Sequence, residues 1–130
     1  MIQGSCCCGA VRFSVSRTPK FVAACHCSRC RKLGATPFAM IEAESFELLS
    51  GREQIVEFQP DPPFKYRRCF CGKCGTSLGE MLSTDKTFPV PVNCFDQDLG
   101  VEIRFHEHVA TKPAWYVIPE GSKQFAGDPG

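Results

Sequence analysis

The amino-acid sequence predicts a mainly β fold built from short strands, and three observations support it. Apolar and polar residues alternate from Val11 to Ser16, which is the pattern of a half-buried strand. Short apolar runs of strand length recur along the chain. Helix signals are confined to one short segment. At 130 residues the chain suits one hydrophobic core, so residues 1–130 are expected to form a single domain.

The individual elements follow from local patterns. We expect strands at 11–15, 21–24, 38–41, 46–48, 54–58 and 101–109, with further extended segments at 64–70 and 77–82. Gln59–Pro63 is expected to be a loop, because its three prolines cannot donate to a strand ladder. A short helix is expected from Ser28 to about Leu33, with Ser28 as its N-cap. The last ten residues are expected to be loosely held.

Charge and composition narrow the class of protein. The formal net charge of +1 gives no reason to expect a nucleic acid or an acidic membrane as a partner. The first residues carry neither the basic stretch nor the apolar run of a secretory signal, and no apolar window is long enough to cross a bilayer. We therefore expect a cytoplasmic protein. The oligomeric state does not follow from the sequence.

The ten cysteines are the unusual feature of the composition. In a reducing compartment, clustered cysteines more often bind metal or carry out chemistry than form disulfides. Nine of them fall in three clusters, Cys6/Cys7/Cys8, Cys25/Cys27/Cys30 and Cys69/Cys71/Cys74, and Cys94 stands alone. Tightly spaced pairs suit one tetrahedral ion, because both sulfurs can turn inward from a single bend. The spacing therefore predicts metal sites.

Four cysteines predict a closed structural zinc site. Cys71 and Cys74 form a knuckle in which Gly75 permits the positive φ that closes the turn. Cys6 and Cys8 would lie on the same side of an extended backbone and complete the shell. The alternative is that these four are unligated core thiols. Zinc is preferred for its redox inertness, although sulfur ligands also suit iron.

A second zinc site is predicted at Cys25, Cys27 and Cys30. Three protein ligands with an exchangeable fourth position is how a catalytic zinc is held. His26 offers an alternative fourth ligand that would close the site, but an extended segment would turn it away from the two cysteines beside it. We expect two zinc ions per chain. Arg29, Arg31 and Lys32 surround this cluster with positive charge, which favours thiolates.

The remaining reactive residues are expected to play no part in chemistry. Three thiols outside the two sites are expected in the core: Cys7, Cys69 and Cys94. His106 and His108 share a polar strand face and are expected to be exposed to solvent. The basic run Lys65–Arg68 is expected to be the solvated face of a strand.

The motifs, taken together, resemble a known family. They are Gly4-Ser5-Cys6-x-Cys8-Gly9-Ala10-Val11, Cys25-His26-Cys27-Ser28-x-Cys30-Arg31-Lys32 and Phe70-Cys71-x-x-Cys74-Gly75-Thr76, with similar flanks at Phe38-Ala39, Lys112-Pro113-Ala114-Trp115 and Phe125-Ala126-Gly127. In order and spacing the chain is similar to the glutathione-dependent formaldehyde-activating family, which also contains centromere protein V. The resemblance implies a β-tent fold of antiparallel sheets clamped by zinc at Cys6, Cys8, Cys71 and Cys74. It also implies a second zinc at Cys25, Cys27 and Cys30, where a thiol such as glutathione engages.

Three functional hypotheses follow. The first is a zinc-dependent carbon–sulfur lyase that forms or cleaves a thiol–aldehyde adduct such as S-hydroxymethylglutathione, the activity that the resemblance implies. In it, Arg29, Arg31 or Lys32 would hold the carboxylates of glutathione. The second is a non-catalytic β-tent binding module whose second zinc is absent or closed by His26. The third is a thiol-redox enzyme with Cys94 or Cys69 as nucleophile, although neither residue has a motif around it.

Overall fold

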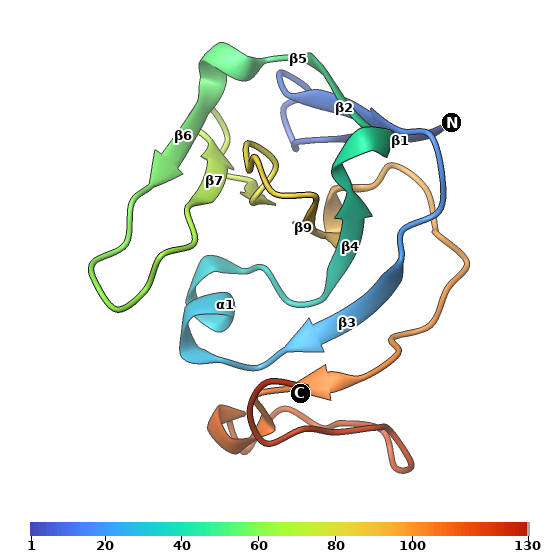
Figure 1. Cartoon of the computed structure of the whole chain (residues 1–130), viewed down its shortest axis with the longest axis vertical. Helices are drawn as coiled ribbons and strands as arrows, with labels where there is room; N and C mark the ends of the chain where they lie inside the picture. Colours follow the sequence, from blue (N-terminus) through green and yellow to red (C-terminus); the bar gives the residue numbers. More distant parts are fainter. Residues whose placement is uncertain (130) are drawn as a thin grey trace.

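Three small sheets make up the computed structural model, which describes residues 1–129 (Figure 1). The strands are β1 (Ile2–Ser5), β2 (Arg12–Val15), β3 (Phe21–Cys25), β4 (Phe38–Glu42), β5 (Phe46–Ser50), β6 (Ile55–Phe58), β7 (Arg68–Cys71), β8 (Ser77–Gly79), β9 (Thr87–Pro91) and β10 (His106–Glu107). Over the described residues, the one α-helix is α1 (Ser28–Leu33), and four 3-10 turns lie at Ala43–Ser45, Arg52–Gln54, Val92–Cys94 and Val109–Thr111. The predicted mainly β fold is confirmed, and the three sheets form the β-tent that the resemblance implied.

The first sheet holds the strands that build the core. Its order is β1-β2-β5, with both neighbours of β2 antiparallel. The alternation in β2 turns Phe13 fully inward, where its ring stacks on Phe46 at 5.5 Å between centroids and meets the edge of Phe95 at 5.4 Å. Ile41 and Leu78 from the other two sheets join this cluster and are fully buried. The core therefore lies between the sheets.

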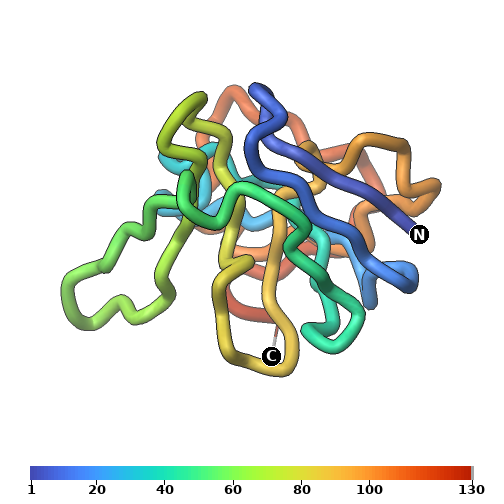
Figure 2. The backbone as a smooth tube through the Cα atoms, turned by 90° about the horizontal axis from the view of Figure 1, so that it is seen from above, coloured from blue at the N-terminus to red at the C-terminus, as the bar shows by residue number. Residues whose placement is uncertain are grey.

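The other two sheets place both cysteine clusters at strand ends. One has the order β10-β3-β4-β9, and β3 ends at Cys25. The other has the order β6-β7-β8, and β7 ends at Cys71. The loop between β6 and β7 contains the proline-rich stretch and projects from the body of the protein, as the green to yellow-green part of the tube at the left of Figure 2 shows. Phe64 and Tyr66 of this loop, and Arg68 just after it, line the cavity described below.

Several predicted elements are confirmed, three expectations are wrong, and two strands were not predicted. The strands at 11–15, 21–24, 38–41, 46–48 and 54–58 exist within a residue or two, as does the helix at 28–33. The expected strand at 101–109 shrinks to β10. Val101 and Ile103 are exposed because, over the described residues, the backbone hydrogen bonds to β3 begin only at Arg104, whose N–H donates to the Val22 carbonyl at 2.8 Å. β10 pairs with β3 in parallel, whereas antiparallel sheets were expected. β1 and β9 were not expected as strands, and Cys27 caps the helix in place of Ser28.

Within residues 1–129, no helix combines the length and the apolar character that a bilayer crossing needs.

Candidate metal centres

The structure brings together the four cysteines that the sequence assigned to one site. The sulfurs of Cys6, Cys8, Cys71 and Cys74 all lie within 4.8 Å of one another. The Cys6 and Cys8 sulfurs are 3.5 Å apart, and the Cys8 and Cys71 sulfurs 3.9 Å apart, although 63 residues separate the latter pair in the chain. Four sulfur atoms this close are positioned to hold one metal ion.

Two glycine-closed turns aim these sulfurs. The Gly9 N–H donates to the Cys6 carbonyl at 3.0 Å, and the Gly75 N–H donates to the Cys71 carbonyl at 2.7 Å. Both glycines have a positive φ, 78° and 80°, which side chains with a Cβ rarely adopt. The extended backbone expected from Cys6 to Cys8 is therefore wrong, since β1 ends before it and the chain turns there.

The surroundings of this cluster favour ionised sulfur at Cys74, whereas at Cys8 a backbone hydrogen bond is outweighed by desolvation and the neighbouring thiols, which raise the pKa to about 11. The Val11 N–H donates to the Cys6 sulfur at 3.3 Å. The Thr76 hydroxyl lies 3.2 Å from the Cys74 sulfur, and its hydrogen bond, helped by backbone N–H groups, lowers the Cys74 pKa to about 5. Thiolates are the form in which cysteine binds a metal, so the donor set fits a soft or borderline cation.

The second cluster is assembled where β3 runs into α1. Cys25 ends β3, Cys27 caps the helix and Cys30 lies in its first turn. Their three sulfurs also lie within 4.8 Å of one another. The Cys27 sulfur accepts the Cys30 N–H at 3.3 Å, which is the capping bond that Ser28 was expected to make. A helix N-terminus favours negative charge, so this cap suits a thiolate.

His26 does not join these sulfurs. Its Nε2 lies 2.8 Å from Nδ1 of His106, and both rings are buried. The expectation that His106 is exposed is therefore wrong, because the return of the chain through β10 places it against β3. Burial lowers the pKa of both histidines, so the pair is neutral. Three sulfurs without a histidine leave a donor set with room for one more ligand.

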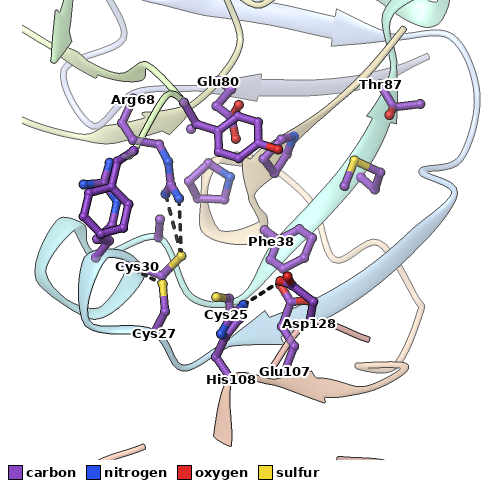
Figure 3. Close-up of a pocket in the computed structure, with 18 of the residues that line it drawn as sticks. Cys25, Cys27, Cys30, Phe38, Arg68, Glu80, Thr87, Glu107, His108 and Asp128 are labelled. Carbon is purple, nitrogen blue, oxygen red and sulfur yellow. Dashed lines mark hydrogen bonds and ion pairs between the residues drawn. The ribbon is translucent and has the colours of Figure 1, made fainter. Parts of the chain in front are cut away.

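Arg68 lies against the second cluster (Figure 3). Its Nη1 and Nη2 lie 3.7 and 3.6 Å from the Cys30 sulfur, to which both donate. The prediction of a solvated strand face holds for Lys65, Tyr66 and Arg67, which are exposed, but it is wrong for Arg68. Nothing in the basic run distinguishes Arg68 from its neighbours, because only the pairing of β6 with β7 decides which side chain turns inward.

The three thiols of this cluster also influence one another. Hydrogen bonding from the Cys25 thiol lowers the pKa of Cys27, and the same contact raises the pKa of Cys25. One sulfur therefore ionises readily while its neighbour keeps its proton. A bound cation would allow all three to ionise, which is the arrangement expected of a metal site.

A cavity of about 890 Å³ opens beside the second cluster. Besides the three cysteines, its wall includes Arg29, Phe38, Met40, Phe64, Tyr66, Arg68, Glu80, Pro89, Glu107 and Asp128. Burial raises the pKa of the Glu80 and Glu107 carboxyl groups. The sequence did not identify Arg68, Glu80 or Glu107, since none carries a local motif. Of the three basic residues named around the cluster, Arg29 alone lines the cavity; Arg31 and Lys32 are exposed on the helix.

A mixed cluster lies at the edge of the same cavity. One ligand atom from each of Glu107, His108 and Asp128 falls within 4.8 Å of the other two. His108 Nε2 is 2.9 Å from the Asp128 carboxylate, which is largely exposed. These groups form a polar rim to the cavity (Figure 3).

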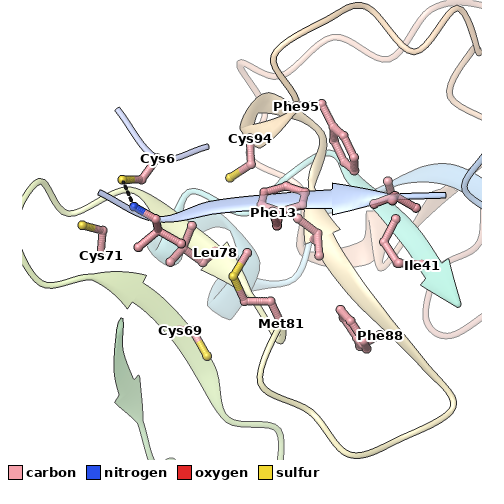
Figure 4. Packing of buried hydrophobic residues seen from close by; sticks show 14 of the residues in the cluster. Cys6, Phe13, Ile41, Cys69, Cys71, Leu78, Met81, Phe88, Cys94 and Phe95 are labelled. Carbon is pink, nitrogen blue, oxygen red and sulfur yellow. Dashed lines mark hydrogen bonds between the residues drawn. The ribbon is translucent and has the colours of Figure 1, made fainter. Parts of the chain in front are cut away.

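The remaining cysteines differ in their surroundings (Figure 4). Cys69 and Cys94 are buried as expected, and burial raises their pKa values to about 11 and about 12. The Cys94 thiol donates to the Ser77 carbonyl at 3.0 Å. Cys7 was expected in the core but is exposed, because the turn that brings the Cys6 and Cys8 sulfurs toward Cys71 and Cys74 leaves Cys7 on the surface. All ten cysteines are free of disulfides.

Comparisons with known proteins bear on the family and the fold of this chain. The model of the family described as glutathione-dependent formaldehyde-activating enzyme matches residues 1–112. A Halomonas elongata protein named "Putative glutathione-dependent formaldehyde-activating enzyme" is 31% identical over 143 residues, which cover 99% of this chain and 89% of the relative. A crystal structure of a Rhodobacter sphaeroides protein shares the fold, with a TM-score of 0.60 and 23% identity over 95% of this chain and 98% of that one. The chain therefore belongs to the glutathione-dependent formaldehyde-activating enzyme family.

Proposed function

We propose that this protein is a zinc-dependent carbon–sulfur lyase that joins a low-molecular-weight thiol to an aldehyde, or cleaves the adduct. The observation that supports it best is the cluster of Cys25, Cys27 and Cys30, whose three sulfurs converge at the wall of a large cavity. Glutathione and formaldehyde are the substrates named by the family. The product would be S-hydroxymethylglutathione.

We propose zinc as the metal at both clusters. Sets of three or four thiolates with tetrahedral spacing are typical of zinc, which undergoes no redox change. The set of Cys6, Cys8, Cys71 and Cys74 is complete and would hold a structural ion. The set of Cys25, Cys27 and Cys30 lacks a fourth protein ligand within the described chain, because His26 is engaged by His106. Zinc bound there would supply an open position at which a substrate thiol loses its proton.

The overall reaction is the addition of a thiol across a carbonyl group. The sulfur forms a bond to the carbonyl carbon, the carbon–oxygen π bond opens, and the oxygen takes up the proton that the thiol released. Cleavage of the adduct is the same sequence in reverse. Neither direction needs an oxidant or a reductant.

The protein's own residues would support this chemistry in two ways. Arg68 donates to Cys30 and offsets the negative charge that gathers on three thiolates. Phe38, Met40 and Pro89 give the cavity an apolar wall, which keeps water from competing with the thiol. At about 890 Å³, the cavity lies within the range of small-molecule sites, so a tripeptide thiol can enter it.

The proposal also includes the domain organisation and the cellular location of the protein. We propose one domain over residues 1–130 and a cytoplasmic location. The ten free cysteines fit a compartment in which glutathione keeps thiols reduced.

The test compares catalysis by the wild-type protein with catalysis by a variant that lacks a cysteine of the second cluster. The zinc-loaded protein, mixed with glutathione and isotope-labelled formaldehyde, should accelerate exchange between free formaldehyde and the adduct, as measured by exchange NMR spectroscopy. The Cys27→Ala variant should keep one zinc and lose the acceleration. Equal exchange rates with and without the wild-type protein would overturn the proposal.

The same preparations address the binding-module hypothesis. A lyase should contain two zinc ions per chain, one of which a mild chelator removes. A protein that holds a single inert zinc and does not bind glutathione at millimolar concentration would be a non-catalytic module.

A further inference from the structure

Arg29 is held at the cavity by aromatic side chains. Its guanidinium carbon lies 4.2 Å from the centre of the Phe64 ring and 6.0 Å from the centre of the Phe58 ring. Stacking of this kind engages the flat face of the guanidinium and leaves the N–H groups at its edge free to donate. The contact therefore fixes the orientation of the Arg29 guanidinium but provides no hydrogen-bond acceptor for its N–H groups.

Arg29 also lacks an acidic partner. Over residues 1–129, the ion pairs are Arg17 with Glu42, Arg17 with Glu44, and His108 with Asp128. The Nη2 of Arg29 is buried and has no hydrogen-bond acceptor among the described residues. A charged donor buried without an acceptor is costly, and an anion entering the cavity would remove that cost.

The position of Arg29 ties this unpaired charge to the thiol site. It precedes Cys30 in α1, and both residues line the same cavity. Arg68, the other guanidinium in the cavity, already donates to the Cys30 sulfur. The Nε of Arg68 is also buried without an acceptor, but both of its terminal nitrogens are engaged by the Cys30 sulfur. Arg29 is therefore the guanidinium whose terminal fork is left for a ligand.

We propose that Arg29 binds the carboxylate of the thiol substrate, so that the site selects thiols that carry a carboxylate over neutral thiols. This inference rests on the proposed function, because it assumes that a thiol enters the cavity. A guanidinium suits the task, since its fork can donate two parallel hydrogen bonds to one carboxylate. The substrate would lie with its sulfur toward the cysteines and its carboxylate toward Phe64 and Arg29.

The test compares two small thiols that differ in charge. Binding of 3-mercaptopropionate and 2-mercaptoethanol to the zinc-loaded protein is measured by calorimetric titration. We expect wild-type protein to prefer the carboxylated thiol. In Arg29→Gln, the affinity for 3-mercaptopropionate should fall by about tenfold or more, while the affinity for 2-mercaptoethanol stays within about twofold. Arg31→Gln, on the exposed side of the same helix, should change neither.

Two further variants distinguish a loss of carboxylate binding from a defect in folding. Arg29→Lys keeps the charge but not the fork, and it should weaken binding of 3-mercaptopropionate less than Arg29→Gln does. Phe64→Leu keeps apolar volume but removes the stacking ring, and it should weaken binding of the carboxylated thiol alone. Zinc content and melting temperature are measured for each variant.

The outcomes separate this inference from the proposed function. If both thiols bind wild-type protein equally, or if Arg29→Gln and Arg31→Gln behave alike, the role of Arg29 is wrong while the lyase proposal stands. If neither thiol binds the zinc-loaded wild type, both are wrong.

Discussion

The imidazole rings of His26 and His106 lie nearly parallel in the interior, with 10° between their planes and 2.8 Å between Nε2 and Nδ1. Backbone contacts reinforce the pair, since the His26 N–H donates to the Glu107 carbonyl at 2.9 Å. The Thr111 hydroxyl donates to the His26 carbonyl at 3.1 Å. Because His26 lies between Cys25 and Cys27, these contacts join the bend that carries the second cluster to the C-terminal part of the chain.

We predict that His106→Phe destabilises the protein by about 1–3 kcal/mol, because the His26 Nε2 would be left buried without a partner. Urea denaturation of the zinc-loaded protein measures the change. Zinc affinity of the second cluster should fall as well, since the bend between Cys25 and Cys27 loses its support. His108→Phe, which alters the neighbouring and more exposed histidine, is the matched control and should cost less.

The same pair predicts a pH dependence. Burial lowers the pKa of His26 and His106 in the folded protein, so the unfolded chain binds more protons just below its own histidine pKa of about 6.5. Stability from this pair is therefore present above about pH 6.5 and is lost as the pH falls through the folded values. Acid also protonates the cysteine ligands and releases zinc, which likewise lowers the stability of the protein as the pH falls.

The contribution of the histidines is isolated by comparing the pH dependence of stability in wild type with that in His106→Phe. Wild type should lose more stability between pH 7.5 and pH 5.5, about one unit either side of the histidine pKa, than His106→Phe does. Equal losses in the two proteins would show that zinc release alone sets the slope.

A second prediction separates the two cysteine clusters by what they do for the fold. Cys71→Ser should destabilise the protein by about 4 kcal/mol or more, because Cys71 is fully buried and its cluster ties the turn after β1 to the turn after β7. Cys27→Ala should cost much less, because its cluster joins residues that are already neighbours in the chain. Thermal denaturation and elemental analysis of both variants check this, and a larger loss in Cys27→Ala would reverse the assignment of roles.

The sequence was sufficient where the signal is local. Cys71 and Cys74 are three residues apart and need only a turn to meet, so their spacing alone indicates a shared ion. The strand around Phe13 was likewise predicted from the alternation of apolar and polar residues. Arg68 and His106 could not be predicted, because each acquires its role from a residue 38 or 80 positions away, through strand pairings that leave no mark on the neighbouring sequence. The segment before β10 alternates like a strand from Val101 onward, but in the described part of the chain its hydrogen bonds to β3 begin only at Arg104, and the alternation does not mark that point.

A third prediction concerns Cys94 and the thiol-redox hypothesis. Burial raises its pKa to about 12, and its thiol donates to the Ser77 carbonyl, so very little thiolate is present at neutral pH. Cys94→Ser should therefore leave the rate of adduct formation within about twofold of wild type. Alkylation followed by mass spectrometry should find Cys94 unmodified in the folded protein and Cys7 modified. Rapid alkylation of Cys94, or loss of activity in Cys94→Ser, would restore the redox hypothesis.

A fourth prediction tests the contact between Arg68 and Cys30. Two guanidinium N–H groups reach this sulfur, so their removal concentrates negative charge on the three-cysteine cluster and makes ionisation of an entering thiol less favourable. In Arg68→Gln, the pH profile of kcat/KM for adduct formation should move to higher pH by about one unit, with about a tenfold loss at neutral pH. Arg67→Gln changes an exposed neighbour of the same charge and should leave the profile in place. A loss of folding would lower kcat/KM by the same factor at every pH. An unshifted profile with a uniformly lower rate would therefore contradict an electrostatic role for Arg68, whereas a profile displaced to higher pH supports it.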